Sequence, residues 1–253
     1  MALASNTLNG IPPRYSVPFI AWQYRFFEPE LKRLAEFVPK DRDAVDVGVW
    51  WGPWSWWLAR RVPHVDSFEA NPALVAKIGS VLPSNVTLHP VALSDQAGEA
   101  KLWIPGGGTG TEGRASLGPT QTAAPGWQQT TVETKRLDDF ELGDVGFLKV
   151  DVEGHELSVL KGATNLLQRT RPIVMVEIES LAEGDEHFDS IIEFMGDHSY
   201  AGSYFLNRRW HPIADLDRQL ARQMAERLSH HGYATNLLLY VRRYAHNFLF
   251  RPT

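Results

Sequence analysis

An α/β fold with a doubly wound, mostly parallel sheet and helices on both faces is predicted by three observations on this sequence of 253 residues. Short apolar runs alternate with helical patterns between residues 44 and 93, which is the βαβαβ order of a parallel sheet. The first run ends in a glycine-rich turn, and a later run, beginning at Leu148, leads into a cluster of acids and a histidine. Ligands bind where the strands of such a sheet end, so the same observations predict where a site lies.

The N-terminal region, residues 1–40, is expected to form an arm and one helix. Residues 1–25 contain many asparagine, proline and aromatic residues without a clear period, so they are interpreted as an arm that could cap a site. A helix is predicted over residues 28–38. Residues 41–253 are then expected to form a single domain, a length that one α/β core accommodates.

The first half of that domain alternates strands with helices. Pro53 opens the first helix at a position where its missing N–H group costs nothing. We predict strands over residues 44–48, 64–68 and 86–93, and helices over residues 53–61 and 72–82.

The second half continues this alternation after a long loop. Segment 105–127 contains too many Gly, Thr, Ser and Pro residues to form a packed element, and such a loop inside a compact domain is usually a lid or a binding loop. Further strands are predicted over residues 99–104, 131–137, 146–151, 172–179, 201–206 and 236–243, and helices over residues 153–168, 185–197 and 215–230.

Composition and charge exclude several classes of function. The chain has no cysteine, which rules out disulfides, thiolate zinc sites and cysteine nucleophiles. Its net charge is −5 and its pI is about 6.0, whereas a general nucleic-acid binder needs a basic surface, so no nucleic-acid partner is expected. No signal peptide and no apolar run long enough to span a bilayer is visible, so we expect a cytoplasmic protein without a membrane partner.

The motif DVGVWWG at the end of the first predicted strand favours an adenosine ligand. Asp46 and Gly48 lie at the strand end and Gly52 at the turn into the helix, where the lack of a Cβ atom lets the backbone approach a ligand. The spacing DxGxxxG lacks the third glycine of the dinucleotide fingerprint, so a smaller ligand such as S-adenosylmethionine is favoured. An ordinary tight turn would explain the glycines equally well.

Two later motifs support the ligand interpretation. The second strand ends in SFEANP, where Glu69 is placed to accept hydrogen bonds from two ribose hydroxyls. In VALSD, after the third strand, Ala92, Leu93 and Ser94 are candidates for contact with adenine, and a turn initiated by the Ser-Asp pair is the alternative. Ser55, in the first turn of the first helix, is also assigned to the cofactor site.

The chain resembles the FkbM-type family of S-adenosylmethionine-dependent O-methyltransferases in five motifs between about residues 44 and 180: DVGVWWGPWS, FEANP, VALSD, LKVDVEGHELSVLKGA and RPIVMVEIE. The resemblance implies a class I methyltransferase fold, with a Rossmann-like seven-stranded sheet whose last strand is antiparallel. It also implies a hydroxyl acceptor that is often a sugar or polyketide. Family members usually carry Ala-Asn after the first motif glycine, whereas this chain has Val49 and Trp50, which puts one cofactor hydrogen bond in doubt.

The motif DVEGHE supplies the candidates for chemistry. Methyl transfer to an alcohol needs a fixed geometry and a base, and His155 is the candidate base because its ordinary pKa lies near neutrality. A structural hydrogen bond at the start of a helix is the alternative role for it. Asp151 is assigned to catalysis and to cofactor binding, and with Glu177 and Glu179 it offers three oxygen ligands suited to Mg²⁺. Direct binding of the cofactor amine or of sugar hydroxyls would explain these carboxylates equally well.

Together these features predict an S-adenosylmethionine-dependent O-methyltransferase acting on a small molecule, most simply a sugar or glycoside hydroxyl, with possible help from Mg²⁺. The nine tryptophans fit sugar stacking. A nicotinamide-dependent oxidoreductase and a noncatalytic sensor of an adenosyl ligand are the alternatives. The aromatic residues expected outside the core suggest a homodimer.

Overall fold

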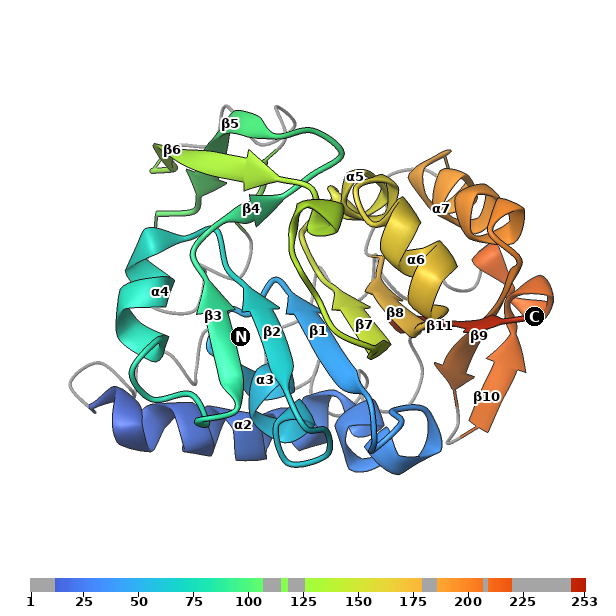
Figure 1. Cartoon of the computed structure of the whole chain (residues 1–253), viewed down its shortest axis with the longest axis horizontal. Coiled ribbons are helices and arrows are strands. Elements are labelled where there is room, and N and C mark those ends of the chain that lie inside the picture. Colours follow the sequence, from blue (N-terminus) through green and yellow to red (C-terminus); the bar gives the residue numbers. More distant parts are fainter. Residues whose placement is uncertain (1–11, 107–114, 118–125, 179–185, 207–208, 220–246) are drawn as a thin grey trace.

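The computed structural model describes residues 12–106, 115–117, 126–178, 186–206, 209–219 and 247–253. Within these ranges the chain forms one eight-stranded sheet and one three-stranded sheet (Figure 1). The main sheet contains β1 (Asp43–Val47), β2 (Val65–Phe68), β3 (Val86–His89), β7 (Val145–Val150), β8 (Ile173–Glu177), β9 (Tyr200–Leu206), β10 (Arg209–Pro212) and β11 (Asn247–Pro252). The smaller sheet contains β4 (Ala92–Leu93), β5 (Gly98–Ile104) and β6 (Gln128–Lys135).

The main sheet has the order β10-β9-β11-β8-β7-β1-β2-β3. Five strands that are adjacent in this order, β3, β2, β1, β7 and β8, pair in parallel, and β11 runs antiparallel to both of its neighbours, β8 and β9. The predicted α/β fold with a mostly parallel sheet and an antiparallel last strand is therefore confirmed. The described sheet has eight strands instead of seven because β10 folds back on β9 and extends the edge.

Helices cover both faces of the main sheet. The α-helices are α2 (Pro13–Phe27), α3 (Pro53–Leu58), α4 (Pro72–Ile78), α5 (Glu156–Lys161), α6 (Thr164–Thr170) and α7 (Glu186–Asp197). Alternate strand residues point to opposite faces, so Val45 and Leu148 pack with α5, α6 and α7, whereas Ala44 and Phe147 pack with α3. No helix in the described ranges is long and apolar enough to cross a membrane.

The prediction for the N-terminal region was wrong about the helix. A helix, α2, spans Pro13–Phe27, where an arm without a period was expected, and residues 28–38 contain only two short 3-10 helices, η1 (Pro29–Lys32) and η2 (Leu34–Glu36). Val17, Ile20 and Ala21 bury one face of α2 at helical spacing. Aromatic residues on the opposite face obscured that period in the sequence.

Two other predicted elements are divided in the structure. The strand expected over residues 86–93 breaks after His89, and β4 leaves the main sheet to pair with β6. The helix expected over residues 153–168 begins only at Glu156 and is divided between α5 and α6 at Gly162, where a Cβ atom would lie 2.1 Å from the main-chain oxygen of Ser94. This close packing explains why the residue at the division is a glycine.

Several predictions fall on residues that the structure does not describe. The strand expected over 236–243, most of the helix over 215–230 and most of the loop over 105–127 lie outside the described residues. Residues 213–215 form a 3-10 helix, η7 (Ile213–Asp215), and the last strand, β11, was not predicted. A further 3-10 helix, η5 (Leu137–Asp139), follows β6.

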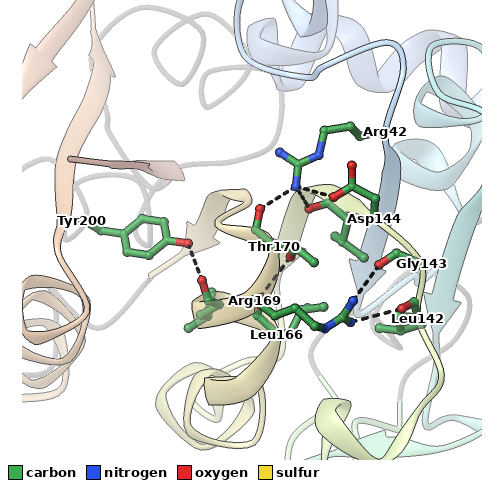
Figure 2. Close-up of polar contacts among 10 residues, drawn as sticks. Arg42, Leu142, Gly143, Asp144, Leu166, Arg169, Thr170 and Tyr200 are labelled. Carbon is green, nitrogen blue, oxygen red and sulfur yellow. Dashed lines mark hydrogen bonds and ion pairs between the residues drawn. The ribbon is translucent and has the colours of Figure 1, made fainter.

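Arginine side chains tie together the end of the sheet opposite to the predicted site (Figure 2). Arg42, just before β1, donates a 2.7 Å hydrogen bond to the main-chain oxygen of Val145 and forms a 2.9 Å ion pair with Asp144. It also donates to the main-chain oxygen of the last residue of α6. Arg169 of α6 donates to two carbonyl oxygens in the loop before β7. These contacts fix the amino ends of β1 and β7, so that their carboxyl ends meet at the other edge.

Candidate functional site

A pocket lies at the carboxyl ends of β1, β2, β7 and β8, the edge at which the sequence predicted a site. We call it the main pocket. Its lining combines apolar side chains with aromatic ones, which include Tyr24, Trp50 and Trp54. The acidic residues in its lining are Glu69, Asp151, Glu153 and Glu177.

Gly48 is required where β1 meets the loop after β7. Its φ angle is +87°, and a Cβ atom there would lie 1.7 Å from the main-chain oxygen of Asp151, so no other residue fits. Gly52 also has a positive φ, +81°, and a Cβ atom there would lie 2.9 Å from the side chain of Leu82. Gly48 lines the main pocket, whereas Gly52 shapes the turn into α3 and is not part of the lining.

Glu69, directly after β2, is held by two main-chain N–H groups. Its Oε2 accepts from the N–H of Trp50 and its Oε1 from the N–H of Asn71, both at 2.8 Å. Burial raises the pKa of Glu69 to about 7. The two N–H groups favour the charged form and so oppose this rise. Each carboxylate oxygen retains a lone pair, so both can accept further hydrogen bonds from hydroxyl groups in the pocket.

Asp46 and Ser55 lie beneath this corner and do not line the main pocket. Ser55 is fully buried, and its hydroxyl donates to Asp46 Oδ2 and lies 2.8 Å from the hydroxyl of Ser67. Burial raises the pKa of Asp46 to about 6. These two predicted cofactor residues therefore join β1, β2 and α3 behind the lining.

The predicted adenine contacts separate between two hollows. Ala92 and Leu93 line the main pocket beside Glu69. Ser94 instead lines a second hollow, which we call the side hollow, together with His155. The chain thus turns away from the main pocket after β4.

His155 lies at the N-terminus of α5, in the side hollow. Its Nε2 is 2.9 Å from the hydroxyl oxygen of Ser94, and burial lowers the pKa of its imidazole. The structure does not bring His155 together with Asp151 in the lining of one pocket. The next residue, Glu156, accepts from the N–H of Gly154 and lies 2.7 Å from the ring of His187.

Asp151 and Glu177 line the main pocket above a buried lysine. Lys149 Nζ lies 3.5 Å from Asp151 Oδ2 and 3.6 Å from Glu177 Oε2, and its side chain has no solvent exposure. Burial first, and then the Glu177 carboxylate, raise the pKa of Asp151 to about 7, while Lys149 opposes both effects. Burial disfavours the charged form of Lys149, but the carboxylates outweigh it, and the pKa of Lys149 lies above its usual range.

A fourth group completes this acidic corner from a distant part of the chain. Glu28, directly after α2, is 4% exposed, and its Oε2 accepts a 2.6 Å hydrogen bond from the indole N–H of Trp54. Burial, and next the charge of Glu177, raise the pKa of Glu28 well above its usual range. The ring of Trp54 lies 5.5 Å from Lys149 Nζ. The lysine is therefore enclosed by carboxylates and an aromatic ring.

This arrangement does not fit the predicted magnesium site. The Lys149 ammonium group already contacts both carboxylates in the described part of that site, Asp151 and Glu177. A divalent ion bound to the same oxygens would lie beside a buried positive charge, which electrostatics disfavours. The third predicted ligand, Glu179, lies outside the described residues, and among those described no group of three or more His, Asp or Glu side chains is placed to hold a metal ion.

The sequence did not identify Lys149, Tyr24 or Glu28 as residues of this corner. For Lys149 a signal existed, because a lysine within an otherwise apolar strand can be buried only if carboxylates accompany it. Tyr24 belongs to the N-terminal segment that the sequence suggested as a cap for a site, although it was not singled out. For Glu28 there was no signal, because only the tertiary fold brings it near Lys149.

Comparison with known proteins identifies a family that matches the part of the chain containing this site. The methyltransferase FkbM domain matches residues 46–202 of the chain. Hexuronic acid methyltransferase AglP of Haloferax volcanii is 30% identical over 188 residues, which cover 68% of this chain and 73% of the relative.

A solved structure of an FkbM methyltransferase shares the fold at low sequence identity. The methyltransferase FkbM structure from Methylobacillus flagellatus has a TM-score of 0.50 at 15% identity over 84% of this chain. The match spans only 44% of the length of that structure. A precorrin-6y C5,15-methyltransferase from Geobacter metallireducens has a TM-score of 0.44 at 11% identity, covering 87% of this chain and 84% of the other.

Proposed function

This chain belongs to the FkbM methyltransferase family, and on that premise we propose that it transfers the methyl group of S-adenosylmethionine to a hydroxyl group of a sugar or glycoside. One observation carries the proposal. The lining of the main pocket contains both Glu69, which can accept hydrogen bonds from hydroxyl groups, and the acidic pair Asp151 and Glu177.

The half of the pocket formed by β1 and β2 fits the methyl donor. Gly48 leaves space where any side chain would clash, and Glu69 presents two oxygens that suit the two hydroxyls of a ribose. Ala92 and Leu93 add apolar surface for a flat base. S-Adenosylmethionine, when bound, would supply an electrophilic methyl group on a sulfonium centre. A nicotinamide dinucleotide fits less well because the turn lacks the third glycine that close packing around a pyrophosphate requires.

The half formed by β7 and β8 fits the acceptor. Asp151 has a pKa of about 7, so a large share of this carboxyl group is deprotonated at neutral pH while remaining basic enough to accept a proton. We assign to Asp151 the removal of the acceptor hydroxyl proton. The like charge of Glu177 keeps the pKa of Asp151 raised. The Lys149 ammonium group forms ion pairs with both carboxylates and so holds Asp151 in position.

His155 is the competing candidate for the base. Its lowered pKa leaves a neutral imidazole that can accept a proton at neutral pH. It would act only on an acceptor that reaches the side hollow, where its Nε2 already contacts Ser94. Asp151 needs no such extension, because it lines the same pocket as Glu69.

The charge of the lining favours a neutral sugar. The relative from Haloferax volcanii acts on a hexuronic acid, whose carboxylate would face Asp151, Glu153 and Glu177 here. Among the described lining residues of the main pocket there are acids and no Lys or Arg. We therefore propose that a neutral glycoside is methylated in preference to a hexuronate, because like charges in a partly desolvated pocket repel.

The test combines binding and turnover. Calorimetric titration with S-adenosylhomocysteine and with NAD should give heat only with the former. Labelled methyl transfer is then measured on a panel of neutral glycosides and matched hexuronates, with and without MgCl₂. We expect an O-methylated neutral glycoside at the same rate with or without the metal. Binding of S-adenosylhomocysteine without product across the panel would support the sensor function instead, and binding of NAD would support an oxidoreductase.

A further inference from the structure

Helix α2 carries an exposed row of aromatic side chains. Tyr15, Phe19, Trp22 and Phe26 are 59%, 47%, 53% and 47% exposed. Their spacing of four, three and four residues places them on one face of the helix. We call this row the aromatic ridge. Within the described part of the chain these are the only large hydrophobic side chains with such exposure.

Three of the four rings of the ridge contact one another, and the core of the fold does not include the ridge. The rings of Phe19 and Trp22 lie 6.4 Å apart and those of Trp22 and Phe26 5.2 Å apart, centroid to centroid. The opposite face of α2 already fixes the helix to the domain through Val17 and Ile20, which pack in a core cluster with residues of α4 and of the turn after β1. The ridge is therefore a second apolar face without a role in the core.

Cations border the ridge at both ends. The guanidinium carbon of Arg14 lies 4.8 Å from the ring centroid of Tyr15, and the ammonium nitrogen of Lys32 lies 4.1 Å from that of Phe26. The nearby acids do not offset them, since Glu28 and Glu30 are each only 4% exposed. This surface is thus basic and aromatic, although the chain as a whole carries a net charge of −5.

We propose that the aromatic ridge binds the surface of a membrane that contains anionic lipids. Aromatic rings beside Lys and Arg are the composition that helices use to lie at the level of the lipid headgroups. A flat anionic surface would satisfy Arg14 and Lys32 together while the rings enter the headgroup layer. The sequence-based expectation of no membrane partner rested on the lack of a spanning segment, which does not bear on contact with a membrane surface.

A second copy of the chain fits the ridge less well. In a parallel two-fold pairing Arg14 would lie beside its own equivalent, and in an antiparallel pairing it would lie near Lys32 of the other copy. Like charges would meet in either case, and the ridge offers no exposed acid to compensate them.

The experiment is co-sedimentation of the full chain with vesicles of phosphatidylcholine alone and of phosphatidylcholine with phosphatidylglycerol. We expect binding only to the anionic vesicles, weakened by salt. The variant Phe19→Ser/Trp22→Ser/Phe26→Ser should lose at least tenfold in vesicle affinity. Arg14→Glu/Lys32→Glu should lose at least about 25-fold, because each of the two basic residues near an anionic surface contributes about fivefold. The matched control Lys101→Glu/Lys161→Glu reverses two exposed cations elsewhere and should bind like the wild type.

The outcomes separate the membrane from a partner subunit. All variants should keep the wild-type melting temperature, since the substituted side chains are exposed. They should also keep the wild-type affinity for S-adenosylhomocysteine, since these residues lie outside the main pocket. Absence of binding to anionic vesicles, or equal loss in the control variant, would overturn the proposal. So would a wild-type dimer in light scattering that the ridge variant converts to a monomer, because the ridge would then be a subunit interface.

Discussion

Two carboxyl groups at strand ends on either side of β1, Glu69 after β2 and Asp151 after β7, have pKa values raised to about 7, yet their surroundings differ. Both oxygens of Glu69 accept main-chain N–H groups at 2.8 Å. Asp151 instead faces the like charge of Glu177 and shares Lys149 with it. Main-chain N–H groups hold the first as a hydrogen-bond acceptor, whereas charged side chains govern the protonation of the second.

The difference follows from where each side chain obtains its partners. The partners of Glu69 are main-chain N–H groups of the adjacent turns, which orient the carboxyl group and favour its charged form. The partners of Asp151 are charged side chains, so its protonation depends on theirs. One pocket thus combines a rigid half, oriented by main-chain groups and suited to binding, with a half governed by charged side chains and suited to chemistry.

The largest expected effect comes from removing the exchangeable proton site. Asp151→Asn should lower kcat by about 10²- to 10⁴-fold, the usual contribution of a general base, while the affinity for S-adenosylhomocysteine changes by less than about tenfold. Single-turnover methyl transfer and calorimetry measure the two quantities. His155→Ala is the matched comparison and should retain kcat within about tenfold. The reverse ranking of the two variants would transfer the base to His155.

Removing the lysine should mainly reduce stability. Lys149→Met leaves Asp151, Glu177 and Glu28 without their cation, and breaking a buried ion pair in this way costs about 3–5 kcal/mol. Chemical denaturation at pH 8 should show the full loss, and at pH 5 a smaller one, because the carboxyl groups are then protonated. Lys101→Met, at an exposed position, should stay within about 0.5 kcal/mol of the wild type. Equal losses at both pH values would show that charge is not the cause.

Glu69→Gln tests the rigid half. Glutamine has one acceptor oxygen where glutamate has two, so one of the two ribose hydroxyls of the donor would lose its acceptor, as would the N–H of either Trp50 or Asn71. Loss of a hydrogen bond to a charged group amounts to about 1.5–3 kcal/mol, which raises the Kd for S-adenosylhomocysteine by roughly 10- to 150-fold. Turnover at saturating donor should change much less. A large fall in kcat with unchanged Kd would contradict the division of roles.

A further effect is a pH dependence of the stability of the unliganded protein. Glu69 and Asp151, each near 7, and Asp46, near 6, have pKa values in the folded chain above their ordinary values near 4. The folded chain therefore binds more protons than the unfolded chain between about pH 4 and pH 7, and stability falls as the pH rises through that range. His155, with its lowered pKa, acts in the opposite sense as a single group.

Thermal unfolding at pH 5.5 and pH 8 measures this dependence. The melting temperature should be higher at pH 5.5, and the Glu69→Gln and Asp151→Asn variants should each reduce the difference. A melting temperature that rises toward pH 8 would mean that these carboxyl groups are not perturbed as described.

Residues whose type is dictated by the end of a strand or a tight turn were predictable, and those whose roles depend on how separate elements pack were not. Gly48 and Glu69 follow from local rules, because strand ends and tight turns restrict which residues can occupy them. Lys149 needed knowledge of which face of β7 meets Glu177. Tyr24 and Glu28 needed the position of α2, whose aromatic ridge masked the apolar period formed by Val17, Ile20 and Ala21. His155 was assigned from its intrinsic pKa, which does not specify the hollow into which it faces.

The central claim is tested most directly by measuring methyl transfer in the wild type and in the Asp151→Asn and His155→Ala variants. The assay uses saturating S-adenosylmethionine and the best neutral glycoside from the panel. The account predicts a methyl group on oxygen in the wild-type product, near-complete loss of transfer in Asp151→Asn and transfer within about tenfold of wild type in His155→Ala. Undiminished transfer by Asp151→Asn, or a product methylated at nitrogen or carbon, would contradict it.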